Sequence, residues 1–204
     1  MKLATYKDGS RDGQLVVVSR DLGTAHYATG IASKLQQVLD DWSFLSPQLQ
    51  DLYDQLNSGR ARHPFPFDPA QCMAPLPRAC QCVRGAAYAS HRELLAHAGL
   101  DTPLPAQPAV ADLIQLASDS FQGPTDEFLC ADPALQPDFE AGWAVFTSDV
   151  PAGCAPARAL ESVRLLALAN TWVLRGLADV ERAAGVGAVQ SRPAVAFSPV
   201  AVTP

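Results

Sequence analysis

The stretch that most constrains the fold is residues 138–147, with the sequence DFEAGWAVFT. Aromatic and branched residues follow an acidic start, and a turn containing proline and glycine comes next, which predicts a β-strand. Side chains alternate between the two faces of a strand, so Glu140 and Gly142 share one face while Phe139 and Trp143 share the other. We therefore expect a strand with one bulky apolar face and one face that carries a single carboxylate.

The overall composition is that of a globular, mildly acidic protein. With 204 residues and 48% hydrophobic residues, the chain can bury a core and form one large or two small domains. A net charge of −6 and a pI near 5.1 argue against a nucleic-acid partner, because the chain has no basic stripe that could contact the phosphates of a nucleic acid. No apolar run approaches the roughly 18 residues of a membrane helix. Residues 1–8 lack the apolar core of a signal peptide, and five cysteines without such a signal are typical of reduced thiols, so we expect a cytoplasmic protein.

The first part of the chain alternates strand and helix patterns. Residues 2–7 and 14–19 predict two paired β segments separated by a turn. Apolar residues from Ile31 to Trp42 recur at helical spacing and predict one amphipathic helix. Ser46 and Pro47 are typical of an N-cap followed by the first helical residue, and Gly59 stands where such a helix would end.

The second part of the chain predicts mostly strands and loops. Residues 63–69 are extended and rich in proline, which fits a linker after a small N-terminal domain. Residues 99–108 predict a loop, residues 157–168 fit either a helix or a strand, and residues 193–202 predict a strand. We therefore expect an α+β protein with a small domain over residues 1–72 and a β-rich domain over residues 73–204.

Three segments resemble bacterial members of the fumarylacetoacetate hydrolase family: residues 1–7, the stretch from Phe65 through Arg78, and residues 190–204. The resemblance covers essentially the whole chain. It implies a small N-terminal domain followed by a catalytic domain with a mixed-sheet β-roll, here incomplete. It also implies hydrolysis of a carbon–carbon bond in a 2,4-dioxo acid, with a magnesium or calcium ion that holds the substrate and a histidine that activates water.

Carried over position by position, the resemblance places the family's catalytic histidine at His91 and one metal carboxylate at Glu140. The arginine and the lysine of the family's site fall on Arg175 and Arg192, where basic side chains stabilise developing negative charge. The other three metal positions hold residues without a carboxylate: Arg84, Gly142 and Thr171.

This set of residues predicts a poor site for a metal. A hard divalent cation needs several anionic ligands, and a single carboxylate holds it weakly. A like charge such as that of Arg84 at about 4 Å costs on the order of 4 kcal/mol at an effective dielectric near 20. We therefore expect no metal cofactor. Arg84 either pairs with Glu140 in place of the cation, as a guanidinium fork suits a carboxylate, or turns to solvent.

Three functional hypotheses follow. The first is a catalytically impaired or inactive relative of the hydrolases, in which His91 is present but does not activate water for hydrolysis. The second is an active hydrolase with a rearranged magnesium or calcium site, whose missing ligands come from Asp119, Asp126 or a partner chain. The third is a binding module for a small dioxo or carboxylic acid, held by Arg175, Arg192 and His91.

The cysteines admit a further interpretation. Cys72, Cys80, Cys82 and His91 are four potential zinc ligands, but their spacing is not that of a recognised closed zinc site. Buried, unreactive thiols are the favoured prediction.

The resemblance also bears on oligomeric state, because family members continue beyond the position of Pro204. A β-rich domain that stops partway leaves strand edges unpaired and apolar faces uncovered. We therefore expect a homodimer, a weakly ordered C-terminal half or poor solubility.

Overall fold

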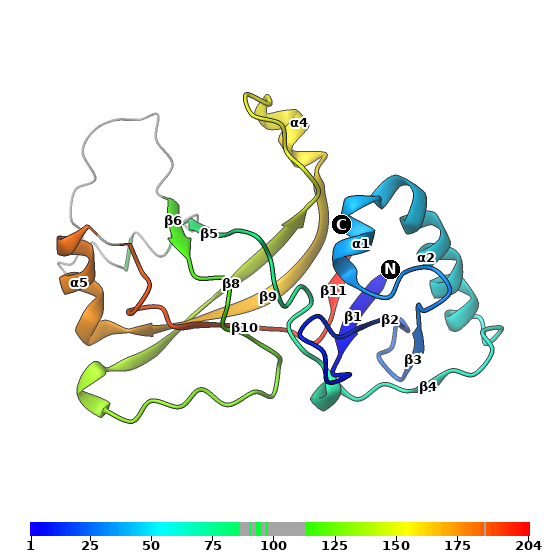
Figure 1. Cartoon of the computed structure of the whole chain (residues 1–204), viewed down its shortest axis with the longest axis horizontal. Coiled ribbons are helices and arrows are strands. Elements are labelled where there is room, and N and C mark those ends of the chain that lie inside the picture. The colour runs from blue at the N-terminus through cyan, green and yellow to red at the C-terminus, as the bar shows by residue number, and fades with distance from the viewer. Residues whose placement is uncertain (86–89, 91–92, 95–96, 98–112, 186) are drawn as a thin grey trace.

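The structure is a computed structural model that describes residues 1–85, 90, 93–94, 97, 113–185 and 187–204 (Figure 1). Its first part contains four strands and two helices: β1 (Lys2–Tyr6), β2 (Gln14–Val18), β3 (Thr24–Tyr27), α1 (Leu35–Asp40), α2 (Trp42–Asn57) and β4 (Phe65–Pro66). The two strands predicted over residues 2–7 and 14–19 are confirmed, and they pair antiparallel with Leu3 opposite Val17.

The helical region differs from its prediction in two ways. The single helix expected between Ile31 and Trp42 is shorter, because α1 covers only residues 35–40 and Trp42 is already the first residue of α2. The helix start at Ser46 and Pro47 is wrong, since Pro47 lies inside α2. A proline there removes one backbone hydrogen bond, and the buried stripe formed by Leu49, Tyr53 and Leu56 keeps the helix in place.

The predicted end of this helix is confirmed. The helix stops at Asn57, and Gly59 follows with a φ of 70°, in the left-handed region where glycine avoids the clash that a Cβ atom would cause.

The second part of the chain is dominated by long strands. It contains β5 (Cys82–Gly85), β6 (Leu113–Leu116), β7 (Phe121–Gln122), β8 (Pro137–Thr147), α4 (Pro156–Leu160), β9 (Val163–Leu174), α5 (Arg175–Ala184), β10 (Ala194–Phe197) and β11 (Ala201–Val202). The ambiguous residues 157–168 contain both the helix α4 and the start of β9. The strand predicted over residues 193–202 is present but broken into β10 and β11. The loop predicted over residues 99–108 lies outside the described residues.

The described strands form one nine-stranded mixed sheet and a separate pair made of β5 and β6. The order along the large sheet is β4-β3-β2-β1-β11-β9-β10-β7, and β8 pairs with the remaining edge of β9. All neighbours are antiparallel except β10 and β7. The α+β class with a large mixed sheet is therefore confirmed.

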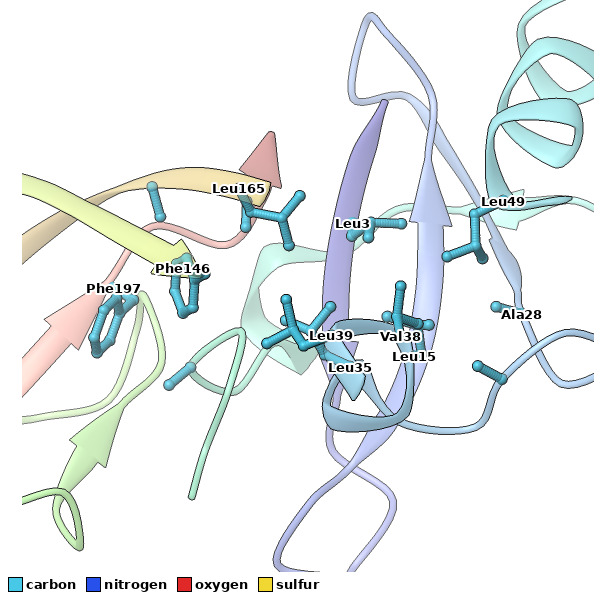
Figure 2. Close-up of a cluster of buried hydrophobic side chains, with 14 of the residues drawn as sticks. Leu3, Leu15, Ala28, Leu35, Val38, Leu39, Leu49, Phe146, Leu165 and Phe197 are labelled. Atoms are coloured by element: carbon cyan, nitrogen blue, oxygen red, sulfur yellow. The ribbon is translucent and has the colours of Figure 1, made fainter. Parts of the chain in front are cut away.

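One buried apolar cluster joins the two parts of the chain (Figure 2). Leu3 and Leu15 of the first part are completely buried, and so is Leu165 on β9. The helices α1 and α2 contribute Leu35, Val38, Leu39 and Leu49 to the same cluster, while Phe146 and Phe197 extend it into the second part. The division into domains at residue 72 stays a prediction.

The strand β8 lies where residues 138–147 predicted it, with Glu140 opposite Thr171 and Trp143 opposite Leu168 on β9. Its bulky apolar face does not belong to the core. Phe139 and Trp143 are each 63% exposed, whereas Gly142 and Ala144 on the other face are half-buried. None of the described helices has the length and apolar character required to cross a membrane.

Candidate functional site

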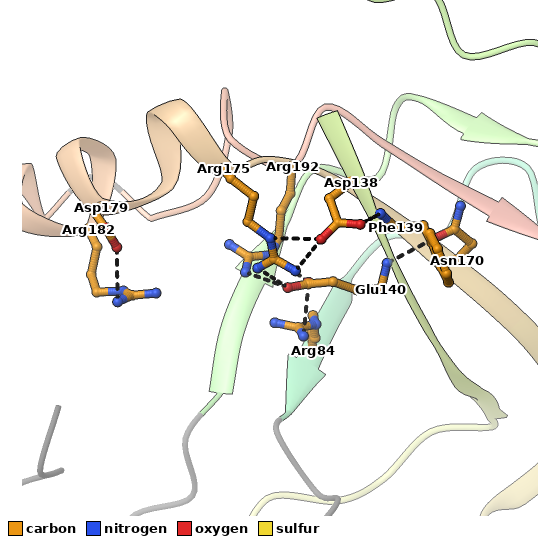
Figure 3. A network of polar contacts seen from close by, with 9 residues as sticks. All are labelled: Arg84, Asp138, Phe139, Glu140, Asn170, Arg175, Asp179, Arg182 and Arg192. Carbon is orange, nitrogen blue, oxygen red and sulfur yellow. Dashed lines mark hydrogen bonds and ion pairs between the residues drawn. The ribbon is translucent and has the colours of Figure 1, made fainter. Parts of the chain in front are cut away.

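The candidate site is centred on the carboxylate of Glu140 (Figure 3). Glu140 lies near the start of β8, and its backbone N–H donates to Oδ1 of Asn170 on β9 at 3.0 Å. Its side chain is only 9% exposed. A carboxylate removed from water to this degree needs strong partners, because burial of an unpaired charge is costly.

Three arginines supply these partners. Arg84 Nη2 lies 2.9 Å from Glu140 Oε2, and Arg175 Nη1 lies 2.9 Å from Oε1. Arg192 approaches both carboxylate oxygens, with Nε 3.3 Å from Oε2 and Nη2 3.5 Å from Oε1. Of the two alternatives considered for Arg84, the structure has the pairing with Glu140, and the two arginines considered as acid-binding residues converge on the same carboxylate. We call these four residues the Glu140 cluster.

The members of the Glu140 cluster come from separate parts of the chain. Arg84 lies on the short strand β5, and Arg175 is the first residue of α5, directly after β9. Arg192 precedes β10 and is buried, with 7% of its side chain exposed. The cluster therefore joins the two-stranded sheet, β8 and the segment between α5 and β10 through charge-assisted hydrogen bonds.

A second carboxylate, Asp138, extends the cluster toward solvent. Arg175 donates from Nε and Nη2 to Oδ2 of Asp138 at 3.2 and 3.1 Å. The backbone N–H of Phe139 and the guanidinium of Arg175 lower the pKa of Asp138. Asp138 was not among the predicted site residues, although its position two residues before Glu140 places it on the same face of the strand. Three guanidiniums thus face two carboxylates, which leaves an excess positive charge.

A buried carboxylate on α5 orders the backbone that carries Arg192. Glu181 accepts hydrogen bonds from the backbone N–H groups of Gln190 and Ser191, both at 2.8 Å. Burial by itself would raise the pKa of Glu181, but the hydrogen bonds to the charged form outweigh it and the pKa is lowered. Glu181 was also missed in the sequence, where an isolated glutamate on a helix gives no signal of this role.

Replacing Glu181 by Ala is expected to lower the free energy of unfolding by about 2 kcal/mol at pH 7, because two backbone N–H groups lose their acceptor. A group with a lowered folded-state pKa stabilises above its unfolded pKa and loses that contribution as the pH falls through the folded value. The difference from the unaltered chain should therefore shrink below the ordinary value of 4.5. Urea unfolding at a series of pH values measures this difference in the free energy of unfolding. The control is Glu161→Ala, because Glu161 is exposed. A constant difference down to pH 3 would contradict the role of the carboxylate.

The residues present do not fit a divalent cation. Gly142 has no side chain to offer, and Thr171 is buried opposite Glu140 with a neutral hydroxyl. The Glu140 carboxylate already accepts from three guanidiniums, each of which would repel a cation. Among the described residues, no three His, Cys, Asp or Glu side chains gather as a metal site.

The residues considered as replacement metal ligands do not join the Glu140 cluster in the described part of the chain. Asp126, considered as a replacement ligand, is paired with Lys7 Nζ at 2.9 Å and accepts from the backbone of Gly123. Asp119 is exposed and joins no such group. His91 lies outside the described residues, so its relation to the Glu140 cluster stays a prediction.

The cysteines do not form a common site in the described part of the chain. Cys72 is buried, and burial raises the pKa of its thiol to about 12, which agrees with an unreactive thiol. The same prediction is wrong for Cys80, which is exposed.

Comparison with solved structures gives relatives of the same fold. The chain is 18% identical to a maleylpyruvate hydrolase from Sphingobium sp. SYK-6, with a TM-score of 0.66, covering 100% of this chain and 67% of that one. A structure of that enzyme in complex with manganese(II) and pyruvate gives a TM-score of 0.65 at 18% identity, with the same coverage. A fumarylacetoacetate hydrolase from Exiguobacterium antarcticum is 20% identical with a TM-score of 0.68, covering 100% of this chain and 66% of that one. The chain thus spans about two thirds of the length of each relative.

Comparison with family profiles covers nearly the whole sequence. The profile described as fumarylacetoacetase N-terminal domain 2 matches residues 1–78, and the profile described as fumarylacetoacetate hydrolase C-terminal matches residues 81–204. No curated protein sequence is significantly similar to the chain. The profile matches and the shared fold show that the chain belongs to the fumarylacetoacetate hydrolase family.

Proposed function

We propose that this protein binds a small carboxylic acid at the Glu140 cluster and does not carry out the metal-dependent hydrolysis of its family. The observation that supports this proposal is the contact of three guanidiniums with Glu140, the one carboxylate that the family resemblance assigns to the metal. Where the family's metal would supply positive charge, this chain has fixed arginines. A guanidinium needs no resident ion to attract an acid, and its planar fork matches the two oxygens of a carboxylate.

The charge balance and exposure of the cluster support an anionic ligand. Three guanidiniums against Asp138 and Glu140 leave one positive charge, and the burial of Glu140 and Arg192 strengthens electrostatic attraction at the inner end of the cluster. Arg175 is the accessible member, with 41% of its side chain exposed. Its hydrogen bonds to the two carboxylates use three of its five N–H groups, so it has donors for a further acceptor.

The relatives suggest which acid to try first. Maleylpyruvate hydrolase has been crystallised with manganese(II) and pyruvate. Pyruvate carries a carboxylate beside a carbonyl oxygen, so both groups can accept from arginine. An acylpyruvate such as acetylpyruvate carries the same head group and is also a 2,4-dioxo acid, which makes it a probe for both binding and hydrolysis.

The test is calorimetric titration of the protein with pyruvate and with acetylpyruvate in the presence of a chelator. We expect binding without metal, and at least tenfold weaker binding by Arg175→Met, which corresponds to about 1.4 kcal/mol. The matched control is Arg182→Met on the same helix α5, because Arg182 pairs with Asp179 at the surface, away from the Glu140 cluster. Equal weakening by both variants would indicate a general charge effect and contradict the proposed site.

A second arm addresses hydrolysis. Acetylpyruvate is incubated with the protein and magnesium, manganese or calcium, and its absorbance is followed. We expect no metal-dependent loss of acetylpyruvate. Binding that requires the metal, together with turnover, would overturn the proposal in favour of an active hydrolase with a rearranged metal site.

A further inference from the structure

One ion pair at the Glu140 cluster uses only a single carboxylate oxygen. Arg175 donates from Nε and Nη2 to the same oxygen of Asp138, Oδ2, at 3.2 and 3.1 Å (Figure 3). The other oxygen, Oδ1, accepts from the backbone N–H of Phe139 at 2.8 Å. Asp138 therefore covers the edge of the guanidinium on which a free carboxylate binds with both of its oxygens.

Another arginine of this chain shows the two-oxygen arrangement. Arg78 donates from the same two nitrogens to both oxygens of Asp12, from Nε to Oδ1 at 2.7 Å and from Nη2 to Oδ2 at 2.6 Å. The guanidinium of Arg78 is the largest cause of the lowered pKa of Asp12. The lowered pKa of Asp138 has the backbone N–H of Phe139 as its largest cause, and Arg175 comes second. Because short charge-assisted hydrogen bonds are the stronger ones, a ligand with two free carboxylate oxygens can bind Arg175 better than Asp138 does.

Asp138 can leave Arg175 without leaving a buried charge unpaired. Its side chain is 48% exposed, so the carboxylate can turn into water, and an exposed pair of this kind contributes little to stability. Arg175 keeps its position, because Nη1 still donates to Oε1 of Glu140 at 2.9 Å and its backbone N–H donates to the carbonyl oxygen of Gln136 at 3.1 Å. A ligand carboxylate therefore replaces that of Asp138, while the buried Glu140 stays paired.

We propose that Asp138 competes with the ligand's carboxylate for Arg175 and thereby determines which acids the site accepts, an inference that rests on the proposed function. An acid that takes the Nε and Nη2 edge displaces Asp138, which stays beside the acid because β8 holds its backbone. Three guanidiniums then face Glu140, Asp138 and the bound carboxylate, so no positive charge is left for a second carboxylate. The like charge of Asp138 also repels such a group. The site therefore favours acids with one carboxylate, such as pyruvate, over 2-oxo acids with two, such as 2-oxoglutarate.

The experiment is calorimetric titration of the unaltered chain and of Asp138→Asn with pyruvate and with 2-oxoglutarate, in the presence of a chelator. Asparagine keeps the size of the side chain and removes its charge. We expect Asp138→Asn to bind pyruvate about fivefold more tightly, which is the upper range for removal of an exposed ion pair. The affinity for 2-oxoglutarate should rise about tenfold or more, because both the competition and the repulsion are removed.

The matched control is Asp179→Asn, which removes the same charge from the surface pair with Arg182, away from the Glu140 cluster (Figure 3). It should leave both affinities unchanged. Binding by Asp138→Asn that is equal to or weaker than that of the unaltered chain overturns the inference, because Asp138 then holds Arg175 in place and does not compete. An equal gain in Asp179→Asn also overturns it, since the gain is then a general effect of charge.

A measurement without any acid separates this inference from the proposed function. Phenylglyoxal modifies guanidiniums, and peptide mass spectrometry measures the modification of Arg175 separately from that of Arg182. We expect Asp138→Asn to raise the rate at Arg175 about twofold or more, because its edge is uncovered, and to leave the rate at Arg182 unchanged. An unchanged rate at Arg175 overturns the inference. Faster modification of Arg175 without binding of either acid by either chain would instead contradict the proposed function.

Discussion

Replacing Arg84 by Asp, Gly142 by Glu and Thr171 by Asp in one chain is expected to raise its affinity for manganese(II) or magnesium above that of the unaltered chain. The triple variant adds three carboxylates and removes one guanidinium around Glu140. Position 171 lies directly opposite Glu140, and position 142 follows two residues later on the same face of β8. Because the number of charged ligands sets the affinity of hard cations, we expect a gain of at least about 100-fold.

Calorimetric titration of chelator-treated protein with each metal measures this gain. Gly142→Glu alone is the control, since it adds a carboxylate while Arg84 still contacts Glu140 at 2.9 Å, and it should gain little affinity. Circular dichroism establishes that the triple variant is folded. A folded triple variant without measurable affinity would mean that these positions do not correspond to the family's metal ligands.

Removing the central carboxylate is expected to have the largest effect on stability. Glu140→Ala leaves the buried guanidinium of Arg192, which is 7% exposed, without its partner. Loss of one member of a buried ion pair typically costs about 3–5 kcal/mol, because the remaining charge is uncompensated. We expect the free energy of unfolding in urea to fall by about 3 kcal/mol.

A double-mutant cycle separates this effect from simple loss of packing. Arg192→Met added to Glu140→Ala should recover part of the stability, because the unpaired charge is then absent. The surface pair of Asp179 and Arg182 provides the comparison, and Asp179→Ala should change stability by less than about 1 kcal/mol. If Glu140→Ala and Asp179→Ala have equal effects, the Glu140 cluster does not contribute to stability as described.

The sequence was informative about the centre of the site because the alternation of a strand is regular. Residues 138–147 predicted which face carries Glu140, and the resemblance placed Arg84, Arg175 and Arg192 near it. The structure adds that all three meet at one carboxylate. The same alternation places Asp138, two residues before Glu140, on the face of the site, so its position was predictable. The role of Glu181 was not, since it depends on a backbone segment that is brought to it by tertiary packing.

The secondary structure was predictable where local sequence patterns determine it, and less predictable where tertiary packing determines the boundaries of an element. The pairing of β1 with β2 and the strand β8 follow from alternation and turn residues. The start of α2 does not follow from such local patterns. Apolar packing along the helix stabilises it although Pro47 lies in its interior. Alternation also cannot tell which face of β8 meets the core. The bulkier face turned out to be exposed, and the face with small residues lies inward.

The pairing of β1 with β11 has a consequence for how the chain folds. Lys2 lies opposite Val202 and Leu3 opposite Ala201, so neighbours in the sheet are separated by nearly the entire sequence. Contacts of such long range require a costly loop closure before they contribute, and they slow folding. During synthesis, β1 has to wait until β11 has left the ribosome before the hydrogen bonds on this side of β1 can form, which exposes the nascent chain to premature association.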